Sequence, residues 1–242
     1  SDFLVTAPYA TTSVGALSGK VYLILGNTLD STTTRYLSDA DYSFLAENAY
    51  DYAGYSAAGI GDVDGDGLDD ILIGAPYNDE GGINRGKAYV VLGASLGTTS
   101  EISLTGADYF FTGENNVDFA GYSVSAAGDV DGDGLDDFLI GASGNDDGGL
   151  NAGKNYLYLA ADLPSVGSTI SLTNSHYNFI GENANDQASF SLSSAGDVDG
   201  DGLDDLLFGA HGNDDGGSNA GKTYLVFASS VVNSGSMSLA SA

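Results

Sequence analysis

The ten-residue segment GDVDGDGLDD occurs three times without a change, at residues 61–70, 128–137 and 196–205. Consecutive copies lie 67 and 68 residues apart, measured from 62 to 129 and from 129 to 197. Repeats of this length are single supersecondary units, and each unit buries its apolar face against its neighbours. We therefore expect an array of similar units and not a single irregular core.

The segments on either side of each copy also recur, although their residues vary. The opening segment SDFLVTAPYATTSVGALSGKVYLILG has later counterparts at 69–93, 136–160 and 204–228. The segment that precedes each acidic copy occurs at 42–60, 109–127 and 177–195. The chain thus holds four copies of the later half of a unit and three of the earlier half. We expect one domain over 1–242, with repeats at approximately 1–46, 47–113, 114–181 and 182–242.

Each unit has the sequence pattern of short strands. Runs such as ILIGA, AYVVLG and YFFTG are rich in β-branched and aromatic residues, and clusters of Gly, Asn and Asp separate them. No segment of helical length repeats its apolar residues with a helical period. The pattern predicts an all-β fold, a β-propeller-type array of four-stranded antiparallel blades in which every blade stacks on its neighbour.

A Gly-Ala-Pro motif follows each of the four opening strand patterns. It is intact at Gly74-Ala75-Pro76, with variants at Thr6-Ala7-Pro8, Gly141-Ala142-Ser143 and Gly209-Ala210-His211. An upstream Phe-Gly position reads Ala53-Gly54, Ala120-Gly121 and Ala188-Ser189, without its Phe. With these motifs and the acidic segments, nearly the whole chain resembles the FG-GAP repeats of integrin α-subunit β-propellers and of many bacterial extracellular proteins.

The resemblance implies a propeller that this chain fills only in part. Propellers of that family usually have about seven blades, and this chain supplies about three and a half. The first blade should lack its first strand and the last blade its last strand, which leaves both ends open. We therefore expect either an excised piece of a longer repeat protein or an assembly with other copies, as a ring or a filament.

The acidic segment has the composition of a cation-binding loop. Its aspartates at positions 1, 3, 5 and 9 repel one another, each pair of charges at ~4 Å costing ~1 kcal/mol in water. Oxygen-only ligation by a flexible loop suits Ca²⁺ better than Mg²⁺, and the backbone carbonyl at position 7 completes the set. We predict three Ca²⁺ sites, held by Asp62, Asp64, Asp66, Leu68 and Asp70; by Asp129, Asp131, Asp133, Leu135 and Asp137; and by Asp197, Asp199, Asp201, Leu203 and Asp205.

Two other interpretations of the loop are weaker. An EF-hand needs an acid at position 12, where this chain has Ile73, Ile140 and Phe208. A solvated acidic turn would not keep one spacing three times. The remaining acid of the first copy is Asp69. Side chains alternate along a strand, so Asp69 should point away from the side of Asp70, and we expect it to be a solvated bystander.

The charge balance restricts the possible partners. The chain has 34 acidic and 6 basic residues, for a net charge of −28, which repels nucleic acid and anionic lipid, so we expect neither as a partner. Four of the basic residues follow a glycine, at Gly19-Lys20, Gly86-Lys87, Gly153-Lys154 and Gly221-Lys222. We interpret them as strand-edge charges that balance nearby acids; a repeated ligand contact is the alternative. No apolar run reaches the ~18 residues of a membrane span.

Catalytic residues are hard to find in this composition. The chain has no Cys, its two histidines, His176 and His211, lie in unequal contexts, and no base is paired with a serine. We expect the tyrosines, including Tyr55, Tyr109 and Tyr122, to pack between blades. The sequence therefore predicts a non-enzymatic, Ca²⁺-stabilised extracellular structural or adhesion module that self-assembles or binds an extracellular protein or glycan. The alternative is a secreted carbohydrate-active enzyme or a lectin-like binder.

Overall fold

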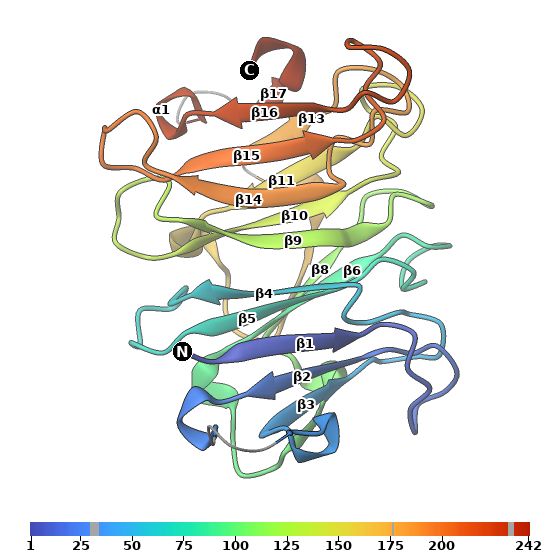
Figure 1. The fold of residues 1–242 in the computed structure, drawn as a ribbon, viewed down its shortest axis with the longest axis vertical. Coiled ribbons are helices and arrows are strands. Elements are labelled where there is room, and N and C mark those ends of the chain that lie inside the picture. Colours follow the sequence, from blue (N-terminus) through green and yellow to red (C-terminus); the bar gives the residue numbers. More distant parts are fainter. Residues whose placement is uncertain (30–33, 176, 232–234) are drawn as a thin grey trace.

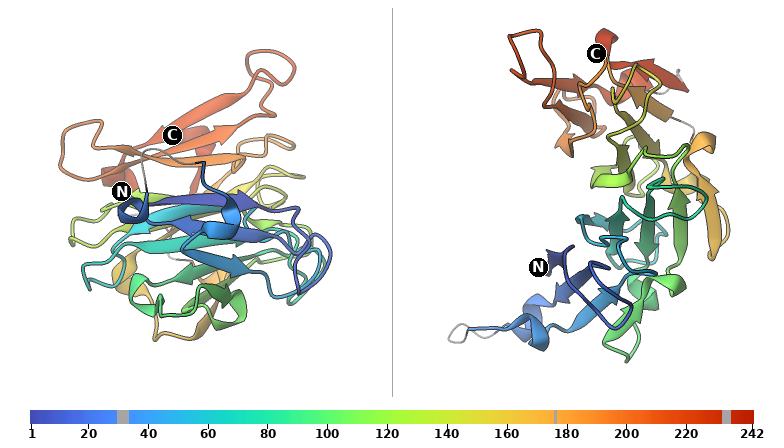
Figure 2. Two further views of the ribbon diagram at one scale, coloured as in Figure 1. Left: turned by 60° about the horizontal axis from the view of Figure 1, so that its bottom comes forward. Right: turned by 90° about the vertical axis from the view of Figure 1, so that its right-hand side faces the viewer.

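The computed structural model describes residues 1–29, 34–175, 177–231 and 235–242, so His176 lies outside the described residues. Four small β-sheets, which we call blades 1 to 4, follow one another in chain order along an open arc (Figures 1 and 2). Blade 1 and blade 4 lie at opposite ends of this arc. The expected all-β, propeller-type architecture with open ends is confirmed.

The strands of each blade have the following bounds. Blade 1 contains β1 (Phe3–Ala7), β2 (Lys20–Ile24), β3 (Tyr42–Leu45) and β7 (Glu101–Ser103). Blade 2 contains β4 (Ser56–Gly61), β5 (Asp70–Ala75), β6 (Lys87–Val91), β8 (Tyr109–Thr112) and β12 (Ser168–Ser171). Blade 3 contains β9 (Ala120–Gly128), β10 (Asp137–Ala142), β11 (Lys154–Tyr158), β13 (Tyr177–Ile180) and β17 (Ser236–Ser238). Blade 4 contains β14 (Ser191–Gly196), β15 (Asp205–Ala210) and β16 (Lys222–Val226).

Helical structure is limited to short turns within the described residues. One α-helical turn, α1, covers Ala228–Val231. The 3₁₀ turns cover Gly26–Thr28, Leu37–Asp39, Gly93–Ser95, Leu104–Gly106, Ala160–Asp162, Leu172–Asn174 and Leu239–Ser241. No helix in this part of the chain is long and apolar enough to cross a membrane.

The core lies between the blades. All six residues of β5 and all six of β10 are buried, because neighbouring blades cover both faces of these strands. This double burial explains why their sequences are continuous apolar runs. Between blades 2 and 3, the Phe111 ring lies 5.4 Å from that of Phe138 and 4.7 Å from that of Tyr158. The Tyr55 and Tyr122 rings also pack across these two blades, at 4.7 Å.

A parallel outer strand adds to the predicted antiparallel blade. β7, β12 and β17 pair in parallel with β3, β8 and β13, respectively. β7 belongs to the connection between β6 and β8 of blade 2, yet it joins the sheet of blade 1. Such a strand could not be predicted from one unit, because its partner lies in the preceding one.

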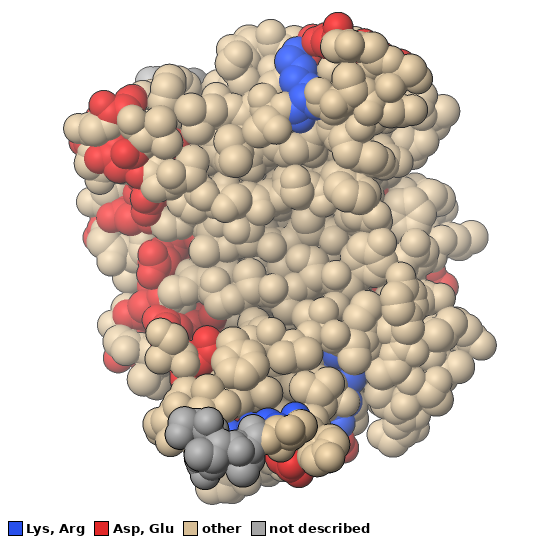
Figure 3. Space-filling view, in the orientation of Figure 1, with Lys and Arg blue, Asp and Glu red and all other residues tan. Residues whose placement is uncertain are grey.

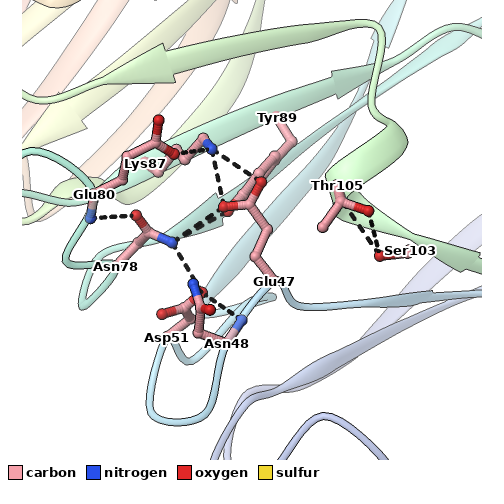
Figure 4. A network of polar contacts seen from close by, with 9 residues as sticks. All are labelled: Glu47, Asn48, Asp51, Asn78, Glu80, Lys87, Tyr89, Ser103 and Thr105. Carbon is pink, nitrogen blue, oxygen red and sulfur yellow. Dashed lines mark hydrogen bonds and ion pairs between the residues drawn. The ribbon is translucent and has the colours of Figure 1, made fainter.

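Three of the four recurring lysines connect neighbouring blades, as Figure 4 shows for Lys87. Lys87, at the start of β6 in blade 2, forms ion pairs with Glu47, which follows blade 1, and with Glu80. Lys154 pairs in the same way with Glu114 at 2.9 Å and Asp147 at 2.7 Å, and Lys222 with Glu182 at 2.6 Å and Asp215 at 2.8 Å. The lysines therefore balance nearby acids, as interpreted from the sequence.

An asparagine–aspartate contact accompanies each of these ion pairs. Asn78 is fully buried and donates from Nδ2 to Asp51 Oδ2 at 2.8 Å (Figure 4). The same bond joins Asn145 to Asp118 at 3.1 Å and Asn213 to Asp186 at 2.8 Å. The sequence analysis missed this network, although its residues recur as ENAYD, ENNVD and ENAND.

Candidate metal centres

The three acidic loops occupy equivalent places in the array. Each connects the first and second strands of a blade: β4 to β5, β9 to β10 and β14 to β15. Figure 3 shows Asp and Glu side chains in a band along the side of the molecule where these connections lie. The acidic loops thus form one band of negative charge at successive levels of the array.

The backbone of the loop folds around its own first aspartate. Asp62 accepts hydrogen bonds from the N–H groups of Gly65 at 2.7 Å, Asp66 at 3.1 Å and Gly67 at 2.8 Å. Gly65 and Gly67 have φ values of 77° and 88°, which glycine adopts without strain. Asp129 and Asp197 accept the same three bonds in their loops. The identical sequence therefore produces the same turn three times.

Three of the four predicted carboxylates meet in each loop. Each group offers oxygens that all lie within 4.8 Å of one another. The groups are Asp62, Asp64 and Asp66; Asp129, Asp131 and Asp137; and Asp197, Asp199 and Asp205. Asp70, Asp133 and Asp201 lie outside these groups, and the carbonyl ligands of Leu68, Leu135 and Leu203 stay predictions.

The ninth-position aspartate is buried beneath the loop and accepts backbone hydrogen bonds that hold the loop in place. Asp70 is 1 % exposed, and its two oxygens accept the N–H groups of Val63 at 2.9 Å and Gly93 at 2.8 Å. Burial raises the pKa of Asp70 to about 6 and that of Asp137 to about 7, because desolvation disfavours the charged carboxylate. A cation near either side chain would favour its charged form.

The loops fit a divalent cation by their donor chemistry. The predicted ligands are oxygen atoms only, from carboxylates and a backbone carbonyl, and a hard cation such as Ca²⁺ prefers such a set. Within the described part of the chain, the ion pairs of lysine and arginine involve none of the predicted loop ligands. Among the residues that the structure describes, no lysine or arginine therefore pairs with these groups, and the three clusters can hold metal ions.

The eighth-position aspartates Asp136 and Asp204 hydrogen-bond to the preceding blade, a role that was not predicted from the sequence. Asp136 Oδ2 of blade 3 accepts the Asp62 N–H of blade 2 at 3.1 Å, and the Asp136 N–H donates to the Asp62 carbonyl at 3.2 Å. Asp204 and Asp129 form the same two bonds between blades 4 and 3, both at 3.1 Å. Asp69 itself is exposed, as expected of a solvated side chain. Its equivalents Asp136 and Asp204 differ, because each reaches the loop of the preceding blade.

Replacement of Asp136 by alanine should lower the free energy of unfolding by about 1–2 kcal/mol, because Asp62 loses its acceptor at a blade boundary. The matched control is Asp69→Ala, because Asp69 is the equivalent residue of blade 2 and contacts no acidic loop among the described residues. This variant should change the free energy of unfolding by no more than ~0.5 kcal/mol. Urea denaturation of the two variants measures the difference. Equal losses of stability would contradict the inter-blade role.

The fold and the site together define a class of protein: an open, propeller-type array of β-blades. Three of its blades carry an acidic loop, able to hold a metal ion, between their first two strands. The sequence model described as FG-GAP repeat matches residues 53–91, 120–158 and 190–226, which contain all three loops. The chain is an FG-GAP repeat protein that resembles the integrin α-subunit propeller.

Curated relatives support this assignment. Integrin alpha-PS2 of Drosophila melanogaster is 35% identical over 169 residues, which are 68% of this chain and 12% of the integrin. Integrin alpha-5 of Xenopus laevis is 31% identical over 221 residues, 88% of this chain and 18% of the integrin. Phosphatidylinositol-glycan-specific phospholipase D of Dictyostelium discoideum is 24% identical over 133 residues, 54% of this chain and 14% of that protein. The chain thus spans less than a fifth of the length of these relatives.

Proposed function

We propose that the chain is a Ca²⁺-stabilised extracellular structural or adhesion module that acts through its protein surfaces. The observation that carries this proposal is the cluster of three aspartates that recurs in three consecutive blades. In two of these blades, the loop that holds the cluster also hydrogen-bonds to the following blade. A cation in such a loop would relieve the repulsion within it and hold the turn on which the next blade packs. Similarity to integrins supports the adhesion role.

The partners that fit this role are proteins or glycans outside the cell. Further FG-GAP repeats, on the same chain or on another copy, match the open ends of the array. The net charge of −28 disfavours nucleic acid and anionic membranes. The repeat limits predicted from the sequence, 1–46, 47–113, 114–181 and 182–242, are the units that we propose for this assembly.

The triple variant Asp64→Ala, Asp131→Ala, Asp199→Ala tests the proposal. These three side chains belong to the three groups, are exposed, and each accepts one hydrogen bond from the backbone two residues on. We expect the variant to lose the stabilisation by Ca²⁺ and to match or exceed the wild-type melting temperature in chelator, because like charges have been removed. Thermal unfolding with and without Ca²⁺ measures both effects.

An enzymatic function is the competing proposal, favoured by the phospholipase D relative. Wild type and triple variant are therefore also assayed for hydrolysis of a polysaccharide panel and of glycosylphosphatidylinositol. Wild-type turnover that disappears in a folded variant would replace the adhesion proposal with an enzymatic one. Ca²⁺-dependent stability in the absence of turnover supports the structural module.

A further inference from the structure

A row of aromatic rings crosses the array where the first strands of blades 2, 3 and 4 begin. Tyr55 directly precedes β4, Tyr122 lies near the start of β9, and Phe190 directly precedes β14. The Tyr122 ring lies 4.7 Å from that of Tyr55 and 5.6 Å from that of Phe190. Tyr77 and Tyr52 continue the row toward blade 1, with ring distances of 6.3 Å from Tyr55 to Tyr77 and 4.8 Å from Tyr77 to Tyr52. The acidic loops lie at the other ends of the same strands.

A groove of about 330 Å³ follows this row across the three blades. The rings at the starts of the three first strands line it, together with one serine from each blade: Ser56, Ser123 and Ser191. Small-ligand sites in proteins have volumes of ~300–1,000 Å³ and combine aromatic walls with a few polar groups. The groove has the size and the lining of such a site.

The groove is uncharged, although the chain has 34 acidic and 6 basic residues. None of its lining residues is acidic or basic, and neither is any residue of β4, β9 or β14. Figure 3 shows the acidic side chains in a band along one side of this face and no charged side chain over its middle, where β4 and β9 lie in Figure 1. A cation would be attracted to the acidic band, and the net charge of −28 repels an anion. The charge distribution therefore favours a neutral ligand in the groove.

Neutral hydroxyl groups supply the polar contacts of the groove. Tyr55 Oη donates a hydrogen bond to Tyr122 Oη at 3.1 Å, which leaves the Tyr122 proton for a ligand. Burial raises the pKa of Tyr55 and that of Tyr77, so both hydroxyls stay protonated at neutral pH. Ser191 is exposed, and within the described part of the chain its hydroxyl has no hydrogen-bond partner. Aromatic faces beside free hydroxyls fit a ligand that is apolar on one face and hydroxylated at its rim.

The backbone is strained where it presents two further rings next to the groove. Tyr52 and Phe119 occupy equivalent positions in successive repeats and have φ values of 55° and 56°. The Phe119 ring lies 5.3 Å from that of Tyr77. A left-handed conformation at a residue other than glycine costs ~1–3 kcal/mol, and such strain gathers at binding sites. The strain therefore supports a binding role for the aromatic row.

We propose that this groove binds a segment of a neutral glycan chain. The C–H faces of its sugar rings pack on the rings of Tyr55, Tyr122 and Phe190, and its hydroxyl groups bond to the tyrosine and serine hydroxyls. The site lies apart from the acidic loops and needs no metal ion for its contacts. It rests on the proposed adhesion function, to which it gives the chemical class of the partner.

Isothermal titration of the chain in Ca²⁺ with cellohexaose and with chitohexaose, two neutral oligosaccharides, should show saturable binding of at least one of them. Tyr122→Leu keeps an apolar side chain at the blade boundary but removes the flat ring, and it should weaken binding about tenfold. Tyr122→Phe keeps the ring, and its affinity should stay within about threefold of the wild type. Tyr36→Ala changes a tyrosine that is 68% exposed and lies outside the groove, and it should leave binding unchanged. The melting temperature of each variant in Ca²⁺ shows that it is folded.

The outcomes separate this site from the proposed function. A folded wild type that binds Ca²⁺ but neither oligosaccharide at millimolar concentration overturns the glycan site alone, as does equal binding by the wild type and a folded Tyr122→Leu variant. Binding of an arginine-rich peptide in place of the oligosaccharides, with loss in Tyr122→Leu, would replace the glycan with a cationic protein segment. A wild type that binds an oligosaccharide through Tyr122 but takes up no Ca²⁺ supports the groove and overturns the Ca²⁺-stabilised module.

Discussion

Calcium at about 10 mM should raise the melting temperature of this chain by roughly 10–30 °C over that in chelator, because the three proposed Ca²⁺ sites would form only in the folded state. A site with a Kd of ~10⁻⁴ to 10⁻³ M, usual for extracellular modules, contributes ~1.4–2.7 kcal/mol at this concentration. Three such sites contribute about 4–8 kcal/mol, and a chain of this size gains ~2–4 °C per kcal/mol. Differential scanning calorimetry in Ca²⁺ and in chelator measures the shift.

Ionic strength must be matched in this comparison, since any salt screens a chain with a charge of −28. Sodium chloride at equal ionic strength gives the screening effect alone. Magnesium should stabilise less than calcium, because it demands octahedral geometry and gives up its water reluctantly. A shift of the same size in sodium, magnesium and calcium would attribute the effect to screening and not to the loops.

Replacement of Lys154 by alanine should cost about 3–5 kcal/mol of folding free energy, the usual loss when one partner of a buried ion pair is removed. Lys154 and Glu114 are 8% and 9% exposed and 2.9 Å apart. Burial alone would lower the pKa of Lys154, but hydrogen bonds to Asp147 and Glu114 raise it above its ordinary value. The variant leaves Glu114 buried at a blade boundary without its cation. Chemical denaturation in saturating Ca²⁺ measures the loss.

Lys222 provides a matched control for this variant. It forms the same pair of bonds with Glu182 and Asp215, but it is 34% exposed at the open end of the array. Lys222→Ala should cost much less than Lys154→Ala, because water screens the remaining charges. The double variant Lys154→Met, Glu114→Leu should recover most of the stability lost in Lys154→Ala. Equal costs at Lys154 and Lys222 would show that burial does not govern the energy of these pairs.

The repeat period and the recurrence of one acidic turn were predictable because each depends on local sequence. GDVDGDGLDD folds around its first aspartate by contacts within the segment, such as that of Asp62 with Gly65 and Gly67, so its shape follows from its letters. The strands were also predictable, because β5 and β10 are buried on both faces and their sequences are therefore rich in apolar residues. The open-ended blade order then followed from counting half-units.

Contacts between units were not predictable in the same way. From its own repeat, Asp136 is expected to be a solvated residue beside a strand. Its hydrogen bond with Asp62 exists only because the preceding blade packs against it. The parallel strand β7 is short and lies in a connection, and its partner β3 belongs to another repeat. Recurrence of the ENxxD pattern was visible, but only the packed blades show that Asp51 receives a buried Asn78.

The number of calcium ions bound per chain is the decisive measurement for the proposal that three loops of this chain bind calcium. Isothermal titration of calcium into the chelator-treated, folded chain gives that number without reference to stability or to any partner. We expect three equivalents for the wild type and none for the variant Asp64→Ala, Asp131→Ala, Asp199→Ala. A folded wild type that takes up no calcium at millimolar concentration, or a triple variant that still binds three equivalents, would contradict it.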